Sequence, residues 1–412
     1  MMDLDCNCET RDRGKGRVFE KVLTDVPEGF YVENWRISGE DLDLGKGVGW
    51  HIHKRRLLGG RSDGVDVVGV NNGRLSFVVA PTRGMGIWKG TFNGCFLGWY
   101  SPVKELVHPN YVNLEDRGGL GWLIGFNEWV VRCGLESNGA PGEDLIIDNM
   151  GNKKTVRLPL HGRIANTPAS EVRAFVGLEH PFEMGVKGAV YERSMFGPNL
   201  KLSTSITSEV GGNWLKISDV VENVGGIPAE MQLLYHCNYG APLLEDGARL
   251  VAPLRRVAPR DQRASEGIGD FDSFGPPQAG FVEQVYFFEL LGDGESRTWV
   301  MLVNKDGTGA TSISFSLKQL PHFTLWKNTA SASDGYVVGL EPATNFPNPR
   351  RFERERSRVI NLKPGEKYTV EMVIAVHLGT EEVQKIEDLI KNLQNAVSPK
   401  VFRNPTPEFS SM

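Results

Sequence analysis

Short runs in which apolar and polar residues alternate are the feature that most constrains the fold of this chain. Residues 200–206 alternate in this way, a Gly-Gly-Asn turn follows, and residues 214–220 alternate again. A period of two puts the apolar side chains on one face of a β-strand, so these runs predict two strands of a meander with one buried face. Residues 64–70 and 75–79 flank an Asn-Asn-Gly sequence, which is a strong signal for a tight hairpin.

Helical periodicity is clear in one segment, close to the C-terminus. Apolar residues at 383, 386, 390 and 393 recur at helical spacing after Thr380, which is a suitable N-cap. The many strand-like runs and this single late helix predict an all-β fold, a large antiparallel β-sandwich of two stacked sheets with a C-terminal helix. We expect residues 29–412 to form this domain, and the charged residues 1–28 to form a loose N-terminal arm.

Charge and hydropathy restrict the classes of partner. The formal net charge of −5 over 412 residues gives no indication of nucleic acid or of an anionic membrane as a partner. The chain has no run of about 18 apolar residues that would predict a membrane span, and its N-terminus has no apolar stretch typical of a secretory signal. Five scattered cysteines do not predict a disulfide framework. We therefore expect a cytoplasmic protein with reduced thiols.

Two residues at the ends of predicted strands could form an acid/base pair. His236 follows the strand-like residues 231–235, and histidine can both give and take a proton near neutral pH. Glu341 follows five uncharged residues, and a buried carboxyl tends to have a raised pKa, which suits a general base. Taken alone, His236 could also be a core histidine bonded to a carbonyl, and Glu341 a solvated strand end.

Several other residues could hold a ligand beside this pair. His161 and Arg163 are two positions apart, so on a strand both side chains would face the same way and could grip oxygen atoms. Arg83 stands beside glycines that leave room for a ligand, and Trp326 next to Lys327 offers an aromatic platform and a cation. The candidate substrate-binding residues are His161, Arg83, Arg163, Asn238, Lys327 and Trp326.

Neither a metal site nor a cofactor site is predicted. His51 and His53 have a spacing suited to a metal on a strand, but three cationic residues follow at once and disfavour a cation there. Trp122 and Trp129 could stack on a sugar ring, although core packing is an alternative for at least one of them.

Three segments in order resemble the aldose 1-epimerase, or galactose mutarotase-like, superfamily, and more closely its DUF4432 branch. Residues 161–165, His-Gly-Arg-Ile-Ala, resemble the element whose histidine contacts the sugar. Residues 222–225 and then 234–239, which contain His236, resemble the strand pair that ends in the acid histidine of the family. Residues 339–342, Gly-Leu-Glu-Pro, fall where the base glutamate lies. Residues 81–87 and 121–141 resemble the DUF4432 branch in particular.

The resemblance covers residues 60–378 and implies a galactose mutarotase-like supersandwich that interconverts sugar anomers. It implies that Glu341 takes the proton of the anomeric hydroxyl and that His236 protonates the ring oxygen. It implies a small-molecule sugar as substrate, no cofactor, and a monomer or homodimer. The alternatives are an epimerase of a phosphorylated or acidic sugar, another carbohydrate-active enzyme such as a hydrolase or lyase, and a protein that only binds carbohydrate.

Overall fold

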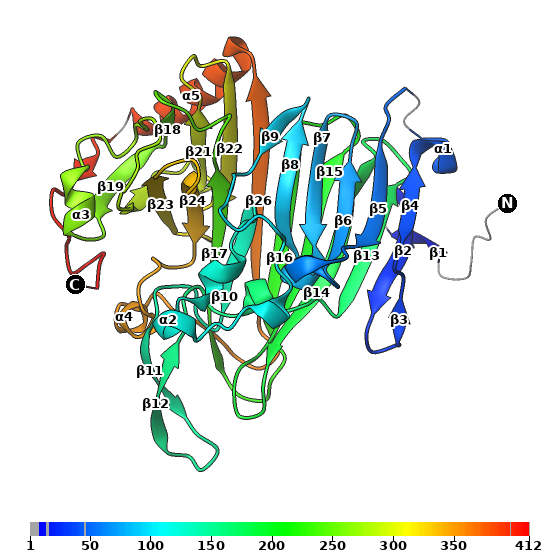
Figure 1. Cartoon of the computed structure of the whole chain (residues 1–412), viewed down its shortest axis with the longest axis horizontal. Coiled ribbons are helices and arrows are strands. Elements are labelled where there is room, and N and C mark those ends of the chain that lie inside the picture. The colour runs from blue at the N-terminus through cyan, green and yellow to red at the C-terminus, as the bar shows by residue number, and fades with distance from the viewer. Residues whose placement is uncertain (1–7, 14–15, 45–46, 396, 412) are drawn as a thin grey trace.

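Two large β-sheets stacked face to face make up most of the protein (Figure 1). The computed structural model describes residues 8–13, 16–44, 47–395 and 397–411. The first sheet contains, in spatial order, β1 (Cys8–Arg13), β2 (Gly16–Asp25), β13 (Glu171–Gly177), β14 (Glu183–Arg193), β15 (Asn199–Glu209), β16 (Trp214–Asn223), β26 (Lys367–Leu378), β22 (Gly309–Ser316), β21 (Arg297–Val303) and β18 (Arg249–Val251), with β3 (Phe30–Tyr31) on β2.

The second sheet carries the residues that matter for function. Its strands are, in spatial order, β27 (Lys400–Val401), β19 (Leu254–Pro259), β20 (Gln284–Leu290), β23 (His322–Thr329), β24 (Tyr336–Ala343), β17 (Ala229–Tyr239), β10 (Val130–Leu135), β8 (Gly86–Phe92), β7 (Leu75–Ala80), β6 (Asp66–Asn71), β5 (His51–Arg56) and β4 (Trp35–Ser38), with β9 (Cys95–Leu97) on β8 and β25 (Ile360–Leu362) on β17. Neighbouring strands pair antiparallel except β19 and β27.

The helices are few and short. They are α1 (Gly39–Leu42), α2 (Asp116–Gly119), α3 (Gln262–Glu266), α4 (Arg350–Glu355) and α5 (Thr380–Gln394), and the 3₁₀ turns are η1 (Gly60–Ser62), η2 (Pro81–Arg83), η3 (Pro109–Tyr111), η4 (Gly121–Gly125) and η5 (Ile164–Asn166). A small hairpin of β11 (Gly142–Ile147) and β12 (Lys153–Leu158) projects from the body (Figure 1). The predicted all-β sandwich with a C-terminal helix is confirmed.

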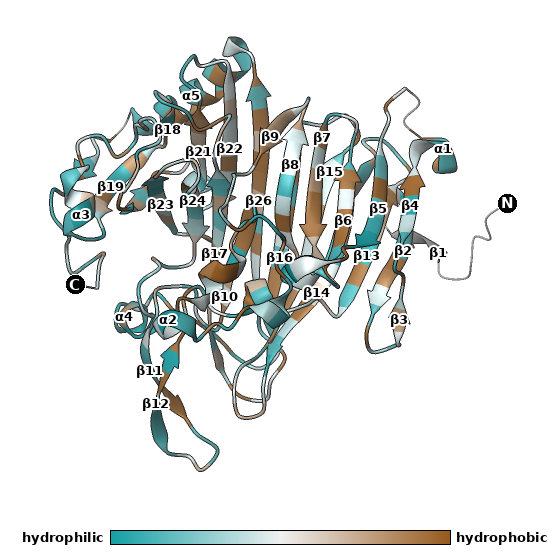
Figure 2. Cartoon of the chain, in the orientation of Figure 1, coloured by the Kyte–Doolittle hydropathy of each residue, from teal (hydrophilic) through white to brown (hydrophobic). Residues whose placement is uncertain are grey.

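The core lies between the two sheets, as the alternation of the sequence requires. Every second residue of β16 is buried, and its partners on β15 follow the same pattern. Ile217 and Val221, for example, pair with Ile206 and Leu202, and all four belong to the central apolar cluster. Figure 2 shows apolar residues recurring along the strands of both sheets.

The N-terminal region differs from the predicted loose arm. Residues 16–25 form β2, which pairs with β13 inside the first sheet, and Phe19 and Leu23 are buried in the core. The apolar residues of this segment, Val18, Phe19, Val22 and Leu23, come in adjacent pairs, so they show no alternation in the sequence. Residues 1–7 lie outside the described part of the chain.

The outer face of the second sheet is covered where β10, β17 and β24 cross the middle of the molecule. Trp99, Trp122 and Phe126, from the long connection between β9 and β10, pack on Val131 and Leu234 of the sheet. A second apolar cluster joins β19 and β20 to the C-terminal segment through Phe287 and Phe409. Loops therefore cover this part of the outer face of the second sheet, and loops over a rigid sheet are a usual setting of a ligand site.

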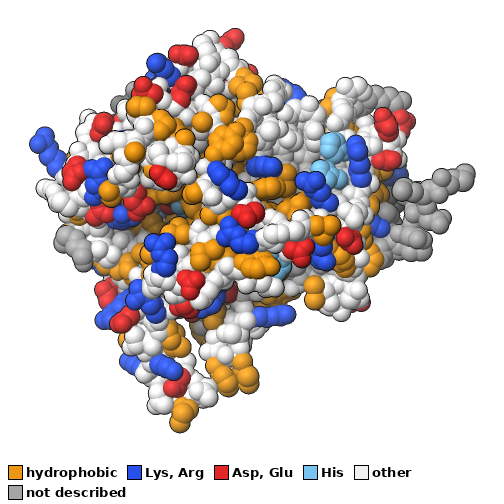
Figure 3. Space-filling model, in the orientation of Figure 1, with side chains coloured by type: hydrophobic (Ala, Val, Ile, Leu, Met, Phe, Trp, Pro, Cys, Tyr) orange, Lys and Arg blue, Asp and Glu red, His pale blue; other side chains and the backbone are white. Residues whose placement is uncertain are grey.

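The rest of the surface is mixed in charge. On the face drawn in Figure 3, basic and acidic side chains are interspersed with apolar ones. No helix in the described ranges is both long enough and apolar enough to cross a membrane.

Candidate active site

The centre of the site is a histidine and a glutamate on adjacent strands. The register of β17 and β24 pairs Cys237 with Leu340, which leaves His236 directly across from Glu341 on the outer face. The His236 Nε2 and Glu341 Oε1 atoms are 3.1 Å apart, and the two side chains are 5% and 3% exposed. The structure thus brings together two residues that are 105 positions apart in the sequence (341 − 236).

A glycine makes room for this contact. Gly339 lies on β24 beside the pair, and a Cβ atom at this position would come within 2.8 Å of both Glu341 Oε1 and His236 Cε1. Trp326 of β23 is the cross-strand partner of Gly339. The missing side chain therefore lets His236 and Glu341 lie close against the backbone of β24 at this position.

Asn238 fixes which nitrogen of His236 carries the proton. Its amide nitrogen donates to the backbone oxygens of Glu128, at 3.0 Å, and of His236, at 3.1 Å. Its Oδ1 atom is therefore the one that faces His236 Nδ1, at 2.6 Å, and only an acceptor is available there. Nδ1 must carry the hydrogen, so the lone pair of a neutral His236 is on Nε2 and points at Glu341.

The electrostatics of the pair favour a single shared proton. Burial and the neighbouring His161 lower the pKa of His236, whereas burial and the charge of Glu283 raise the pKa of Glu341. Both shifts favour the uncharged forms, in which the Glu341 carboxyl donates to Nε2. Moving that proton across 3.1 Å gives a carboxylate and an imidazolium without changing the total charge.

His161 and three aromatic rings wall the site. The ring of His161 is 5.5 Å from that of His236, and Phe126 and Trp326 are 5.1 and 5.3 Å from His236. Trp122 packs on both histidines, with its ring 4.6 Å from His161. Aromatic faces of this kind can stack on the C–H face of a sugar ring.

The free edge of His161 is an acceptor. Its Nδ1 atom is 2.8 Å from the backbone oxygen of Asn138, so Nδ1 carries the hydrogen and Nε2 carries the lone pair. Burial lowers the pKa of His161 to about 4, which keeps the ring neutral at pH 7. Its Nε2 atom, for which no hydrogen-bond partner is found among the described residues, can accept a hydrogen bond from a hydroxyl group.

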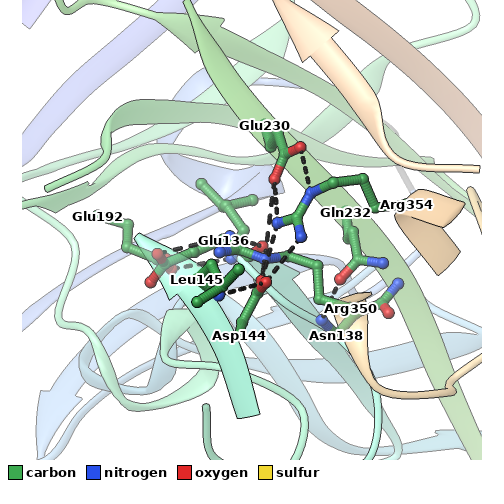
Figure 4. A network of polar contacts seen from close by, with 10 residues as sticks. Glu136, Asn138, Asp144, Leu145, Glu192, Glu230, Gln232, Arg350 and Arg354 are labelled. Atoms are coloured by element: carbon green, nitrogen blue, oxygen red, sulfur yellow. Dashed lines mark hydrogen bonds and ion pairs between the residues drawn. The ribbon is translucent and has the colours of Figure 1, made fainter. Parts of the chain in front are cut away.

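A buried polar network holds the segment that positions His161 (Figure 4). The carboxylate of Glu192 accepts from the backbone N–H groups of Leu135 and Glu136, at 2.8 and 2.9 Å. Arg350 donates to the backbone oxygen of Glu136 and also pairs with Asp144. Because these bonds fix residues 135–136 from both sides, the nearby carbonyl of Asn138 is a rigid support for His161.

Two buried polar atoms at the site have no hydrogen-bond partner within the described chain. These are the indole Nε1 of Trp122 and the hydroxyl of Thr324. Thr324 is the cross-strand partner of Glu341, and the ring of Trp122 packs on His161. Buried polar groups are normally paired, so a donor and a hydroxyl left open beside the acid/base pair suit a ligand that carries hydroxyl groups.

The rim of the site is a chain of polar contacts along the sheet. Glu283, which directly precedes β20, accepts from Trp326 Nε1 at 2.7 Å with one oxygen and from Arg260 at 3.0 Å with the other. Arg260 also donates through Nε to Asp261, at 2.8 Å. These groups are partly exposed, so they mark where the buried pair meets solvent.

Three predicted ligand-binding cations lie away from the pair. Arg83 is fully buried and binds Glu128 and the backbone oxygen of Gly125, so it supports the loops. Lys327 points to the opposite side of β23 from Trp326 and donates to the backbone oxygens of Asp270 and Ser273.

The third cation, Arg163, is about half exposed, and its nearest carboxylate is that of Glu115, at 3.7 Å. His161 and Arg163 do not face the same way because the chain turns sharply between them. His161 has a φ of 58° and Gly162 a φ of 71°, so this segment is not a strand.

Some residues of the site could not be recognised in the sequence. Phe126, Arg260 and Glu283 carry no motif, and only the pairing of distant strands brings them to His236. The sequence offers Trp122 for sugar stacking, and the structure places it against both histidines. Trp129 instead packs on Tyr239 in the core.

Comparisons with known proteins agree with this architecture. Residues 62–376 match the family model described as a domain of unknown function, DUF4432. A Klebsiella pneumoniae protein of known structure, provisionally named an aldose 1-epimerase, is 34% identical to this chain, with a TM-score of 0.88 over 95% of this chain and 99% of its own. No curated protein matches the chain.

More distant structures share the fold alone. A galactose mutarotase-like protein from Clostridium acetobutylicum is 15% identical, with a TM-score of 0.53 over 79% of this chain and 98% of its own. An Escherichia coli K12 protein, also provisionally named an aldose 1-epimerase, is 14% identical, with a TM-score of 0.52 over 76% of this chain and all of its own. The chain therefore belongs to the DUF4432 family and has the galactose mutarotase-like sandwich fold.

Proposed function

We propose that this protein is an aldose 1-epimerase-like isomerase that interconverts the α and β anomers of a free sugar. The observation that carries the proposal is the buried contact between His236 and Glu341, whose Nε2 and Oε1 atoms are 3.1 Å apart. The provisional name of the Klebsiella pneumoniae relative points to the same class of reaction.

The pair has the spacing that this reaction needs. The hydroxyl oxygen and the ring oxygen of a cyclic sugar are bonded to the same anomeric carbon, so an acid and a base in contact can serve both. In the ion-pair form, Glu341 takes the hydroxyl proton while His236 protonates the ring oxygen. The bond between the anomeric carbon and the ring oxygen then breaks and leaves an open-chain aldehyde.

Ring closure reverses the same steps. After opening, Glu341 is protonated and His236 is neutral, which is the uncharged form that burial favours. Rotation about C1–C2 presents the other face of the aldehyde, the ring hydroxyl returns its proton to His236, and Glu341 protonates the new anomeric oxygen. Protons balance over the cycle, and each transfer contributes roughly 10²–10⁴-fold to the rate.

The walls of the site would orient the sugar. Nε2 of His161 can accept from a hydroxyl, Trp122 Nε1 can donate, and the Thr324 hydroxyl can do either. The ring of Trp326, held by Glu283, offers a face on which the sugar can stack.

Exchange NMR of anomers tests the proposal directly. The wild-type protein should accelerate exchange for at least one neutral aldose in a panel, and His236→Ala and Glu341→Gln should each lower that rate by roughly 10²–10⁴-fold. Glu143→Gln, on the projecting hairpin, makes the same chemical change away from the site and should exchange normally. Wild-type rates in either site variant would refute the roles, and saturable binding without accelerated exchange would indicate a carbohydrate-binding protein.

A further inference from the structure

The rim of the site contains a cation, Arg260, whose charge is neutralised by neighbouring carboxylates. Arg260, Glu283 and Trp326 lie in a row on the outer face, at or next to β19, β20 and β23, and the row leads across the sheet to Glu341 on β24. We propose that Glu283 is a specificity-determining residue that neutralises Arg260, so that the site takes uncharged sugars and discriminates against phosphorylated or carboxylated ones. This inference rests on the proposed function only for the identity of the ligand as a sugar.

The charge balance at the rim supports the proposal. Arg260 contributes one positive charge, and Glu283 and Asp261 contribute two negative ones, so the three sum to −1. Arg260 Nη2 binds Glu283 at 3.0 Å and Nε binds Asp261 at 2.8 Å. An anionic group arriving here would meet a guanidinium that is already occupied on both edges.

The other basic residues considered as ligand contacts do not replace Arg260. Arg83 is buried against Glu128, Lys327 lies on the far side of β23, and Arg163 extends toward Glu115. The negative charge of Glu283 also acts on Glu341 and His161, where it favours the protonated forms. The mouth of the site therefore repels anions as long as Glu283 is charged.

Glu283 holds Trp326 in addition to neutralising Arg260, and the substitution Glu283→Gln separates these two roles. Its Oε2 atom accepts the indole hydrogen of Trp326 and so holds the aromatic face over the site. Glutamine keeps a carbonyl oxygen for this bond but removes the charge. Glu283→Gln should therefore leave Trp326 in place while it frees the Nη edge of Arg260, whereas Glu283→Ala loses both functions.

The same strand offers a matched control. Glu289, at the other end of β20, also binds an arginine, Arg256, at 2.6 Å. Glu289→Gln thus breaks an equivalent pair on the same strand and the same face, but away from Trp326 and Glu341. Any general effect of loosening an arginine–glutamate pair on β20 would appear in both variants.

The experiment compares each sugar with its anionic counterpart. Anomer exchange and quenching of tryptophan fluorescence are measured for glucose, glucuronate and glucose 6-phosphate, and for galactose and galacturonate. Glu283→Gln should improve the ratio of anionic to neutral sugar by about 5- to 10-fold, as expected for one charge a few ångströms away in a solvated site. The gain should shrink in 1 M salt and disappear in the double variant Glu283→Gln with Arg260→Gln.

The outcomes separate this inference from the proposed function. Improved binding of the anionic sugars without exchange of any sugar would support the inference and refute the epimerase proposal. A Glu283→Gln variant that binds anionic sugars no better than the wild type would overturn the inference, whether or not exchange is seen. An equal gain in Glu289→Gln, or a gain that survives the loss of Arg260, would overturn it as well.

Discussion

Tyr235 and His236 are neighbours on β17, yet they belong to two very different buried polar clusters. Tyr235 faces the core between the sheets, where Arg132 and Asp219 form a two-pronged ion pair. Two further residues complete this inner cluster. The Tyr235 hydroxyl donates to Asp219 at 2.7 Å, and the Thr204 hydroxyl accepts from Arg132 at 2.7 Å. His236 faces the outer side, where its Nε2 atom is 3.1 Å from Glu341 Oε1 and where no guanidinium is bonded to that carboxyl among the described residues.

The difference separates a structural role from a chemical one. In the inner cluster the donors and acceptors match, so the charges are fixed and the cluster holds the two sheets together. In the outer cluster the pKa shifts favour the uncharged forms of His236 and Glu341, and the polar atoms of Trp122 and Thr324 have no partner among the described residues. Groups that are short of partners and have shifted pKa values are typical of functional sites.

The largest expected effect comes from breaking the inner cluster. Asp219→Ala leaves the buried Arg132 without its counter-charge and should lower the free energy of unfolding by about 3–5 kcal/mol. Urea denaturation followed by tryptophan fluorescence measures this change. The double variant Arg132→Leu with Asp219→Leu should recover much of the loss, because no charge then remains buried. A single variant as stable as the wild type would show that the pair contributes little.

Removing the support of His236 should have the next largest effect, and mainly on activity. Asn238→Ala takes away the acceptor for Nδ1–H, so the proton is no longer confined to that nitrogen. Loss of one buried hydrogen bond costs about 1–3 kcal/mol, and anomer exchange should fall by roughly 5- to 100-fold. Asn238→Asp keeps the acceptor oxygen and should regain part of the rate, with the acidic limb of the pH profile moved upward. Equal loss in both variants would indicate a merely structural role.

The stability that the outer cluster contributes should depend on pH. The pKa of His161 is about 4 in the folded protein and 6.5 for an ordinary histidine, so the unfolded chain binds its proton first. The stability due to neutral His161 is therefore fully present above pH 6.5 and is lost as the pH falls toward 4. As the pH falls from 6.5 to 4, the urea midpoint of the wild type should therefore fall by more than that of His161→Gln. An equal fall in both proteins would contradict the low pKa.

The smallest effect on stability is expected where the effect on activity is greatest. Glutamine has nearly the shape of a protonated glutamate, so Glu341→Gln should change the free energy of unfolding by less than about 1 kcal/mol. The urea experiment used for Asp219→Ala provides the comparison. A loss as large as that of Asp219→Ala would mean that Glu341 carries a structural charge, and the contrast between the two clusters would fail.

The sequence predicts those parts of the molecule that depend on local periodicity. The alternation in β15 and β16 and the helical spacing of α5 each follow from one face being buried. Strand β2 could not be predicted in this way, because only Phe19 and Leu23 among its residues are fully set into the core and its pairing with β13 spans about 150 residues.

The site residues, too, can be predicted only in part from the sequence. His236 and Glu341 stand at strand positions that sequence reasoning can single out, and the strand register then brings them together. The position of Arg163 depends on the left-handed turn at His161, which reverses the direction expected from alternation. The contributions of Phe126 and Glu283 depend on how loops and strand ends meet over the sheet, and no local pattern encodes that meeting.

The acid/base pair is attached to paired strands, whereas the residues around it come from loops and a strand end, and this difference determines how the site can be altered. His236 and Glu341 are attached to paired strands, so the hydrogen-bond ladder itself sets the distance between proton donor and acceptor. His161 and Trp122 reach the site from connecting loops, and Glu283 from a strand end. Rebuilding those connections would change which molecules are admitted, while the chemistry underneath keeps its spacing, so this architecture lends itself to retargeting by loop exchange.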